Sequence, residues 1–206
     1  MTTRRYQMTE RAETTVRTQQ RIVRAAVRLH ARNGVRATRW DDIAATARTG
    51  RATVYRHFPD LAALVPACAR AVFAAIDLPD AATLEREFAD PARPELRLAR
   101  LIRQTCECYE RGAGWLRAAE RESDLVPELA GAMRRIRSGV AVLLEVVLRS
   151  TPVTEEHRRV IGALLDFSFW RQLRQAGIAP GAAADTILEL ALSQLAPRRY
   201  PRRSDG

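Results

Sequence analysis

Residues 37–58 read ATRWDDIAATARTGRATVYRHF, and this stretch decides the fold that we expect for the chain. Its apolar residues fall into two short helical segments separated by a polar turn. We predict a first helix that begins after Thr38, with Asp41 completing a capping box, and a second helix from about Arg51 to Phe58. Two short helices joined by such a turn form a helix-turn-helix, whose second helix fits the major groove of DNA.

Helices are also expected on both sides of this motif. The preceding helix has apolar residues from Ile22 onward on one side and ends at Asn33-Gly34, a typical helix stop. The following helix starts with Asp60 as its N-cap and contains Pro66, which removes one backbone hydrogen bond and predicts a kink.

The basic residues of the 206-residue chain are concentrated at its two ends. All 34 of them are arginine, and the net charge is +10. Residues 1–60 hold 13 arginines against 5 acidic residues, whereas residues 61–196 hold 17 against 18. A basic N-terminal quarter on a neutral body favours a polyanionic partner, most commonly nucleic acid. Residues 197–206 carry 4 more arginines and are expected to form a basic disordered tail.

Composition argues against several other classes of protein. The chain has no apolar run long enough to span a membrane and no signal-peptide pattern, so we expect no membrane association and a cytoplasmic location. Its three cysteines lack metal-site spacing and a histidine partner, and we expect reduced, mostly buried thiols. No catalytic triad, phosphate loop or metal motif is found, so we expect neither enzymatic activity nor a cofactor.

Helical periodicity continues through the rest of the sequence, so the predicted fold class is all-α. We expect an N-terminal three-helix helix-turn-helix domain and a C-terminal helical domain. The C-terminal helices are expected over residues 95–111, 115–122, 125–149, 155–175 and 182–196, with Gly112 and Gly114 separating the first two. The last two are apolar over more than one face and need a second surface to bury against. We therefore predict a homodimer formed through the helices 155–175 and 182–196.

The stretch from Arg21 to Leu64 resembles a known family. The strings IVRAAVRLHARNGVRAT, DDIAATA, RATVYRHF and PDLAAL follow one another there, and together they are similar to the N-terminal domain of the tetracycline-repressor (TetR) family of transcriptional regulators. The segment FWRQLRQAGIAPGAAADTILELAL is similar to the helices that dimerise family members. The resemblance implies a DNA-binding domain over residues 1–60 and a ligand-binding and dimerisation domain over residues 61–196.

The resemblance also implies that the second helix of the motif contacts DNA in two ways. Side chains with a hydroxyl or imidazole group would contact backbone phosphates. Side chains that face the groove would read bases, where an arginine can bind guanine through two hydrogen bonds. The first group comprises Thr53, Tyr55 and His57, and the second comprises Arg51, Ala52 and Arg56. Thr38 and Arg39, at the start of the preceding helix, are further DNA-binding candidates.

Three positions depart from the family pattern. Arg48 stands where the family usually has glycine in the turn, and a left-handed backbone there would cost about 1 kcal/mol, so we expect a different turn. Gly50 takes the usual Ser or Thr cap position, which is tolerated. Leu61 replaces a Lys that holds a phosphate in many relatives, so one expected DNA contact is absent.

In the family, the larger domain binds a small molecule, and the resemblance implies an effector here too. The residues that could supply apolar volume with a few polar groups are Cys106, Tyr109, Trp115, Met133 and Phe167. The expected effector is a mostly hydrophobic molecule of unknown identity. Its binding would weaken DNA binding through a coupling free energy of about 1–3 kcal/mol.

These observations predict a ligand-responsive transcriptional repressor that binds a palindromic double-stranded DNA operator as a homodimer. Two other functions stay open at the level of sequence. One is a sequence-indifferent DNA-binding protein, in which the basic N-terminal region does all of the binding. The other is a helical small-molecule binder that has lost DNA binding, which the departures at Arg48 and Leu61 allow.

Overall fold

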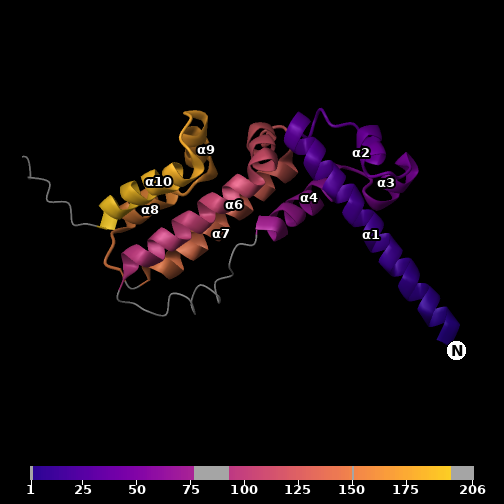
Figure 1. Cartoon of the computed structure of the whole chain (residues 1–206), viewed down its shortest axis with the longest axis horizontal. Coiled ribbons are helices and arrows are strands. Elements are labelled where there is room, and N and C mark those ends of the chain that lie inside the picture. The colour runs from indigo at the N-terminus through magenta and orange to yellow at the C-terminus, as the bar shows by residue number, and fades with distance from the viewer. Residues whose placement is uncertain (1, 77–92, 150, 196–206) are drawn as a thin grey trace, which may run out of the picture. The chain divides into compact units, whose positions relative to one another are not determined.

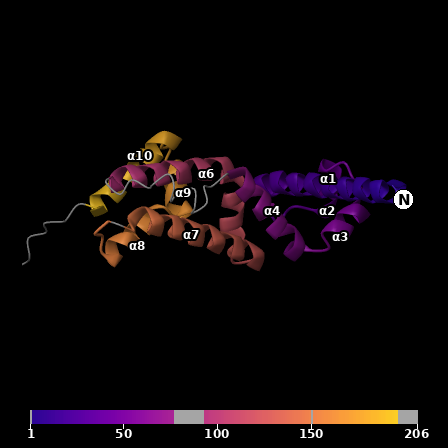
Figure 2. The same cartoon turned by 90° about the horizontal axis from the view of Figure 1, so that it is seen from below.

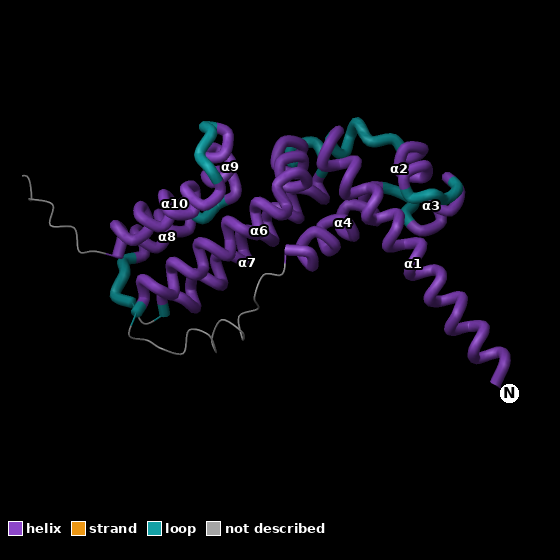
Figure 3. The backbone as a smooth tube through the Cα atoms, viewed as in Figure 1, coloured by secondary structure: helices purple, strands orange, loops and turns teal. Residues whose placement is uncertain are grey.

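The computed structural model describes residues 2–76, 93–149 and 151–195, with side chains from residue 13 to residue 75 in the first range and throughout the other two. All regular secondary structure in these ranges is helical (Figures 1 and 3), which confirms the predicted all-α class. The tail predicted over 197–206 lies outside the described residues. Within them, no single helix is long and apolar enough to cross a membrane. The helices Arg51–His57 and Leu61–Ala75 reach the required length and apolar composition only when they are taken together, and they are bent by 81° with respect to each other.

The chain divides into two compact units that do not follow the order of the sequence. The first contains Met1–Asp77 and Gly112–Arg135, and the second contains Leu78–Arg111 and Ile136–Gly206. Two long helices, α6 (Pro94–Glu122) and α7 (Pro127–Leu148), therefore contribute residues to both units. The predicted boundary between the two domains near residue 60 stays a prediction.

The first unit is built on α1 (Thr2–Asn33), against which α2 (Trp40–Thr46) and α4 (Leu61–Ile76) pack. Figure 2 shows α3 (Arg51–His57) and α4 on the same side of α1. The apolar face predicted for α1 is buried at Ile22, Val23 and Ala26 and half-buried at Val27 and Leu29, and α2, α3 and α4 each bury part of their apolar residues. Fully or almost fully buried side chains in this unit include Ile22, Ala26, Ile43, Val54, Leu64 and Leu116. Each large apolar side chain of this kind contributes about 1.5–3 kcal/mol by leaving water.

Two predicted helix ends in the first unit are confirmed. Gly34 follows α1 with a φ of +88°, in the left-handed region, and its N–H donates to the His30 carbonyl at 2.9 Å. Asp60 caps α4, because its Oδ1 accepts the Ala63 N–H at 2.8 Å. Pro66 lies inside α4 and does not end it.

The predicted capping box at the start of α2 is wrong. The Thr38 hydroxyl donates to the Gly34 carbonyl at 2.6 Å, so it closes the loop that follows α1. Arg39 occupies the N-cap position of α2 with an extended backbone and no side-chain cap hydrogen bond. A threonine before a helix can bond to a preceding carbonyl as readily as to a following N–H, so the sequence pattern does not separate the two arrangements.

The second unit is an assembly of helices around an aromatic cluster. It contains α8 (Glu155–Leu164), α9 (Phe167–Gln175) and α10 (Pro180–Leu195), together with the parts of α6 and α7 given above. α10 packs against both α8 and α9. The Tyr109 ring centroid lies 5.3 Å from that of Phe167 and 5.8 Å from that of Trp170, and all three side chains are buried.

The break predicted at Gly112 and Gly114 does not occur, because α6 runs unbroken through both glycines. A Cβ atom added at Gly114 would lie 2.9 Å from the Cβ of Ala31 in α1. The glycine therefore permits close packing between two helices and does not end one. This use of glycine depends on a residue 83 positions away, which no local pattern reports.

The helix predicted over 155–175 is divided in the structure between α8 and α9. The Asp166 carboxylate caps α9 by accepting the Ser168 N–H at 2.8 Å. Arg137 holds the other carboxylate oxygen of Asp166 at 2.8 Å, and the Tyr109 hydroxyl donates to the Leu165 carbonyl at 2.9 Å. Partners from α6 and α7 thus bind polar groups at the break and stabilise it.

Candidate nucleic-acid interface and ligand pockets

α2 and α3 are joined by the tight turn that the helix-turn-helix pattern predicts. The Ala47 N–H donates to the Ile43 carbonyl at 2.8 Å, and the Thr49 N–H donates to the Ala44 carbonyl at 3.0 Å. Arg48 has a φ of 51°, the only positive value among the non-glycine residues of the described ranges. The expectation of a different turn is therefore wrong, and the chain keeps a left-handed residue there at a cost of about 1 kcal/mol.

α3 buries one face in the first unit and leaves the other open. Val54 is fully buried and Phe58, directly after the helix, is 2% exposed, so these two side chains anchor α3. The predicted base-reading residues Arg51, Ala52 and Arg56 are exposed, and the predicted phosphate-contacting residues Thr53, Tyr55 and His57 are half-buried. A helix anchored on one side and exposed on the other can enter a groove of the duplex.

Arg51 is held by side chains of α2 and of its own helix. Its Nη1 lies 3.2 Å from each carboxylate oxygen of Asp41, and its Nη2 donates to the Tyr55 hydroxyl at 3.4 Å. The guanidinium carbon is 5.5 Å from the Tyr55 ring centroid, and that ring packs on Trp40 with centroids 5.1 Å apart. The hydrogen bond to Tyr55 and the negative charge of Asp41 raise the pKa of Arg51, which stays protonated.

Sequence reasoning missed Trp40 and Asp41 as partners of α3. Both lie in the first turn of α2, and only the packing of α2 on α3 brings them to Arg51 and Tyr55. The sequence does carry a partial signal for these contacts: Arg51 and Tyr55 are four residues apart and so share one face of a helix. An aromatic and an acidic residue, Trp40 and Asp41, precede them in the neighbouring helix. The ion pair with Asp41 is exposed, so Arg51 can exchange it for a phosphate or a base at little cost.

The remaining predicted residues lie at the start of α2. Arg39 is exposed, whereas Thr38 is half-buried and its hydroxyl proton is used by the Gly34 carbonyl. Exposed arginines between residues 36 and 56 are Arg36, Arg39, Arg48, Arg51 and Arg56. Such a group of cations attracts a polyphosphate backbone and makes binding depend on salt.

The five predicted pocket residues are all buried, but they belong to different units. Trp115 and Met133 lie in the first unit, whereas Cys106, Tyr109 and Phe167 lie in the second. Trp115 packs edge-on against Phe73, with ring centroids 6.5 Å apart. As ligand-binding residues, all five stay predictions.

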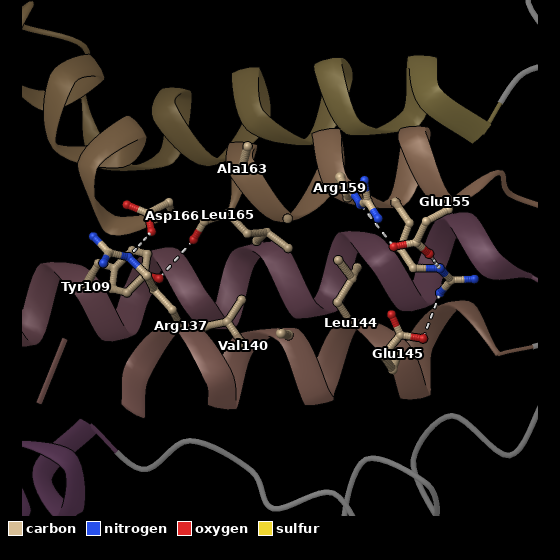
Figure 4. A pocket seen from close by; sticks show the side chains of 13 residues that line it. Tyr109, Arg137, Val140, Leu144, Glu145, Glu155, Arg159, Ala163, Leu165 and Asp166 are labelled. Carbon is tan, nitrogen blue, oxygen red and sulfur yellow. Dashed lines mark hydrogen bonds and ion pairs between the residues drawn. The ribbon is translucent and has the colours of Figure 1, made fainter. Parts of the chain in front are cut away.

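A pocket of about 290 Å³ lies between α7 and α8 in the second unit, and Tyr109 of α6 also lines it (Figure 4). Val140, Leu144 and Leu165 supply apolar walls. Tyr109 is almost fully buried, and burial followed by the nearby Asp166 charge raises its pKa above the ordinary range. Its hydroxyl therefore stays protonated and keeps the bond to the Leu165 carbonyl.

The charged side chains around this pocket form ion pairs with one another (Figure 4). Arg137 pairs with Asp166 at 2.8 Å, Arg158 with Glu145 at 3.2 Å and Arg159 with Glu155 at 3.2 Å. The three arginines and three carboxylates leave no net charge. Apolar walls with a few polar groups and no net charge suit a mostly apolar ligand.

A second pocket, of about 490 Å³, lies between α6 and α10, and Cys106 lines it. An ion pair between Arg103 and Asp185, 3.4 Å apart, also borders this pocket. Burial raises the pKa of Cys106 to about 12, so the thiol is protonated and a poor nucleophile. All three cysteines are buried and free, which confirms the prediction of buried thiols.

A comparison with protein families matches one segment of the first unit. Residues 22–68 match the family of bacterial regulatory proteins described as the tetR family. This match covers α2 and α3 entirely, together with residues 22–33 of α1 and the start of α4. The resemblance stated from the sequence strings is therefore confirmed. A comparison with curated protein sequences finds no match.

Solved structures similar to this chain cover most of its length. A transcriptional regulator from Rhodococcus sp. Rha1 is 18% identical with a TM-score of 0.64, over 86% of this chain and 95% of that one. A TetR family member from Streptomyces coelicolor A3 is 21% identical with a TM-score of 0.63, over 84% and 97%. The TetR-like regulator LfrR from Mycobacterium smegmatis, in complex with proflavine, is 26% identical with a TM-score of 0.55, over 88% and 98%.

Proposed function

We propose that this chain is a ligand-responsive transcriptional repressor. The match of residues 22–68 to the tetR family and the fold similarity to a TetR-family member support the proposal. In this proposal it acts in the cytoplasm, binds a palindromic operator as a homodimer, and leaves the operator when a small, mostly hydrophobic molecule binds. The observation that carries the proposal is α3, whose Val54 is buried while Arg51, Ala52 and Arg56 are exposed.

Within this interface, Arg51 and Arg56 read base edges, and Thr53, Tyr55 and His57 contact phosphates. The contacts of Arg51 with Asp41 and Tyr55 support this division, because they hold the guanidinium in place before DNA arrives. An arginine restrained in this way loses less conformational entropy on binding than a free one.

The proposed dimer forms through α8, α9 and α10, which occupy the predicted dimerisation segments 155–175 and 182–196. Two observations support this surface: α8 and α10 pack on each other, and each leaves a large apolar side chain exposed. Val160 of α8 is 38% exposed and Leu190 of α10 is 41% exposed. A second subunit that covered Val160 and Leu190 would remove their apolar surface from water. In this arrangement residues 1–60 bind DNA and residues 61–196 dimerise and bind the effector.

The proposed effector site is the pocket between α7 and α8 that Tyr109 lines. Its volume, its apolar walls and its paired charges support a ligand that is largely apolar and carries few polar groups. The LfrR structure contains proflavine, so proflavine is a suitable first probe. We expect proflavine to bind this chain and to lower its affinity for the operator.

Operator binding is tested with the DNA upstream of the protein's own gene and an excess of bulk competitor DNA. We expect a specific complex of two chains, with an affinity that falls steeply as salt rises. Arg56→Ala should weaken binding to the operator at least roughly fivefold and relax base preference at one position in each half-site. Arg135→Ala, which removes an exposed arginine from α7, is the matched control and should leave base preference unchanged.

The same titrations separate the two other functions. A sequence-indifferent DNA-binding protein would bind the upstream fragment and bulk DNA equally well. A small-molecule binder without DNA binding would bind neither, and would still bind a probe in the second unit. Either result would contradict the proposed repressor.

A further inference from the structure

A buried carboxylate at the end of α6 holds the loop between α1 and α2. Glu122 is the last residue of α6 and is 7% exposed. Its Oε2 accepts the backbone N–H groups of Val35 at 3.0 Å and Arg36 at 2.9 Å, and its Oε1 pairs with Arg121 at 3.2 Å. One side chain thus binds two consecutive amides of a loop 86 and 87 residues earlier in the sequence.

Gly34 makes room for this carboxylate. A Cβ atom added at Gly34 would lie 2.0 Å from the Glu122 Oε1 atom, a distance that requires the carboxylate to move. Gly34 also has a φ of +88°, which side chains rarely adopt. The loop is therefore shaped both to turn after α1 and to receive the Glu122 side chain.

The charge of Glu122 is stabilised by its partners. Burial alone would raise the pKa of Glu122, but the hydrogen bonds from the Arg36 amide, the Arg121 side chain and the Val35 amide lower it below its ordinary value. The group is thus ionised at neutral pH. Hydrogen bonds from N–H groups to an ionised carboxylate are roughly twice as strong as those between neutral groups.

A second contact joins α6 to α1 itself. Gly114, eight residues before Glu122 in α6, packs on Ala31 in α1 at a distance that only glycine allows. Eight residues of helix span about 12 Å, so α6 is attached at two separated points. The end of α6 and the loop that leads into α2 therefore form one structural element within the first unit.

We propose that Glu122 is a positioning residue for the helix-turn-helix: it fixes the α1–α2 loop on the end of α6 and thereby sets how α2 and α3 are presented to DNA. The inference rests on the proposed DNA-binding function. α6 continues without a break from the residues that line the pockets, Cys106 and Tyr109, to Glu122.

The test compares three variants of the full chain. Glu122→Ala removes both loop hydrogen bonds, Glu122→Gln keeps one neutral acceptor oxygen, and Asp124→Asn removes an exposed carboxylate two residues further on as the matched control. We measure operator affinity per folded dimer, amide hydrogen exchange of Val35 and Arg36, and the thermal midpoint. Glu122→Ala should weaken operator binding about tenfold, Glu122→Gln less, and Asp124→Asn less than twofold.

Amide exchange should accelerate at Val35 and Arg36 in Glu122→Ala and stay slow in the Asp124→Asn control. The inference would be overturned if folded Glu122→Ala bound the operator as tightly as wild type. It would also be overturned if the two Glu122 variants lost operator binding only because a fraction of the protein was unfolded. If the wild-type chain binds no DNA specifically, the repressor proposal fails by itself. Amide exchange then still decides whether Glu122 fixes the loop, because unchanged exchange in Glu122→Ala excludes it.

Discussion

Lowering the pH from 7 to 5 should destabilise this protein through His30, and the structure sets the size of the effect. His30 lies in α1, is 1% exposed, and neither of its ring nitrogens has a hydrogen-bond partner among the described residues. Burial lowers the pKa of His30 to about 4, and the nearby Glu122 charge opposes this shift only in part. The imidazole is therefore neutral in the folded protein at neutral pH.

The sign follows from proton binding in the two states. An unfolded chain protonates this histidine near pH 6.5, whereas the folded chain does so near pH 4, so the unfolded state binds more protons between these values. The free energy of unfolding is therefore highest above pH 6.5 and falls as the pH drops toward 4. From pH 7 to pH 5 the His30 contribution to stability should fall by about 2 kcal/mol.

Urea unfolding at pH 7, 6 and 5 measures this loss, and His30→Leu isolates it. The variant keeps an apolar group in the cavity and has no proton to bind, so its free energy of unfolding should fall by about 2 kcal/mol less than that of wild type over the same range. Carboxylates titrate in both proteins and cancel in the difference. His157→Leu, at a half-buried position in α8, is the control and should follow wild type. Equal losses in wild type and His30→Leu would refute the reasoning.

Three further predictions concern stability and are read from thermal or urea unfolding. Gly114→Ala should destabilise the protein by about 1 kcal/mol or more because its Cβ would meet α1 at 2.9 Å, whereas Gly139→Ala in α7 has free space and should stabilise it by about 0.5–1 kcal/mol. The two glycine variants should change the free energy of unfolding in opposite directions, and a more stable Gly114→Ala would contradict the close packing on α1. Arg48→Gly should stabilise by about 1 kcal/mol because φ is 51° there, and a loss would exclude strain at this turn. Tyr109→Phe should cost about 1–2 kcal/mol by leaving the Leu165 carbonyl without its donor, and no change would exclude that bond.

Local chemistry explains the features that the sequence predicted correctly. Asp60 caps α4 and Gly34 ends α1, because caps and stops act within a few residues of the chain. The short apolar segments that contain Ile43 and Val54 likewise predicted two helices, and each of them buries one face. Basic residues concentrated before residue 60 pointed to a polyanion through charge alone.

Three predictions failed where the local sequence pattern was compatible with more than one arrangement. Gly114 looked like a helix break and is a packing contact with Ala31, and the division at Asp166 depends on Arg137, 29 residues away. Thr38 could have capped α2 but bonds backward instead. In each case the local pattern allowed two arrangements. At Gly114 and Asp166 a partner distant in sequence selected one, whereas at Thr38 the choice was made by the Gly34 carbonyl, four residues earlier.

By itself, the sequence determined the helical class and the two short helices of the helix-turn-helix, because periodicity and turn chemistry are properties of neighbouring residues. The residues of α3 that would contact DNA followed from the family resemblance and stay a proposal. Only the tertiary structure decided that Asp41 and Tyr55 hold Arg51, that a pocket lies beside Tyr109, and that Glu122 binds the loop before α2. These contacts join residues that are up to 87 positions apart. Their existence depends on how helices pack, which the pattern along one helix does not contain.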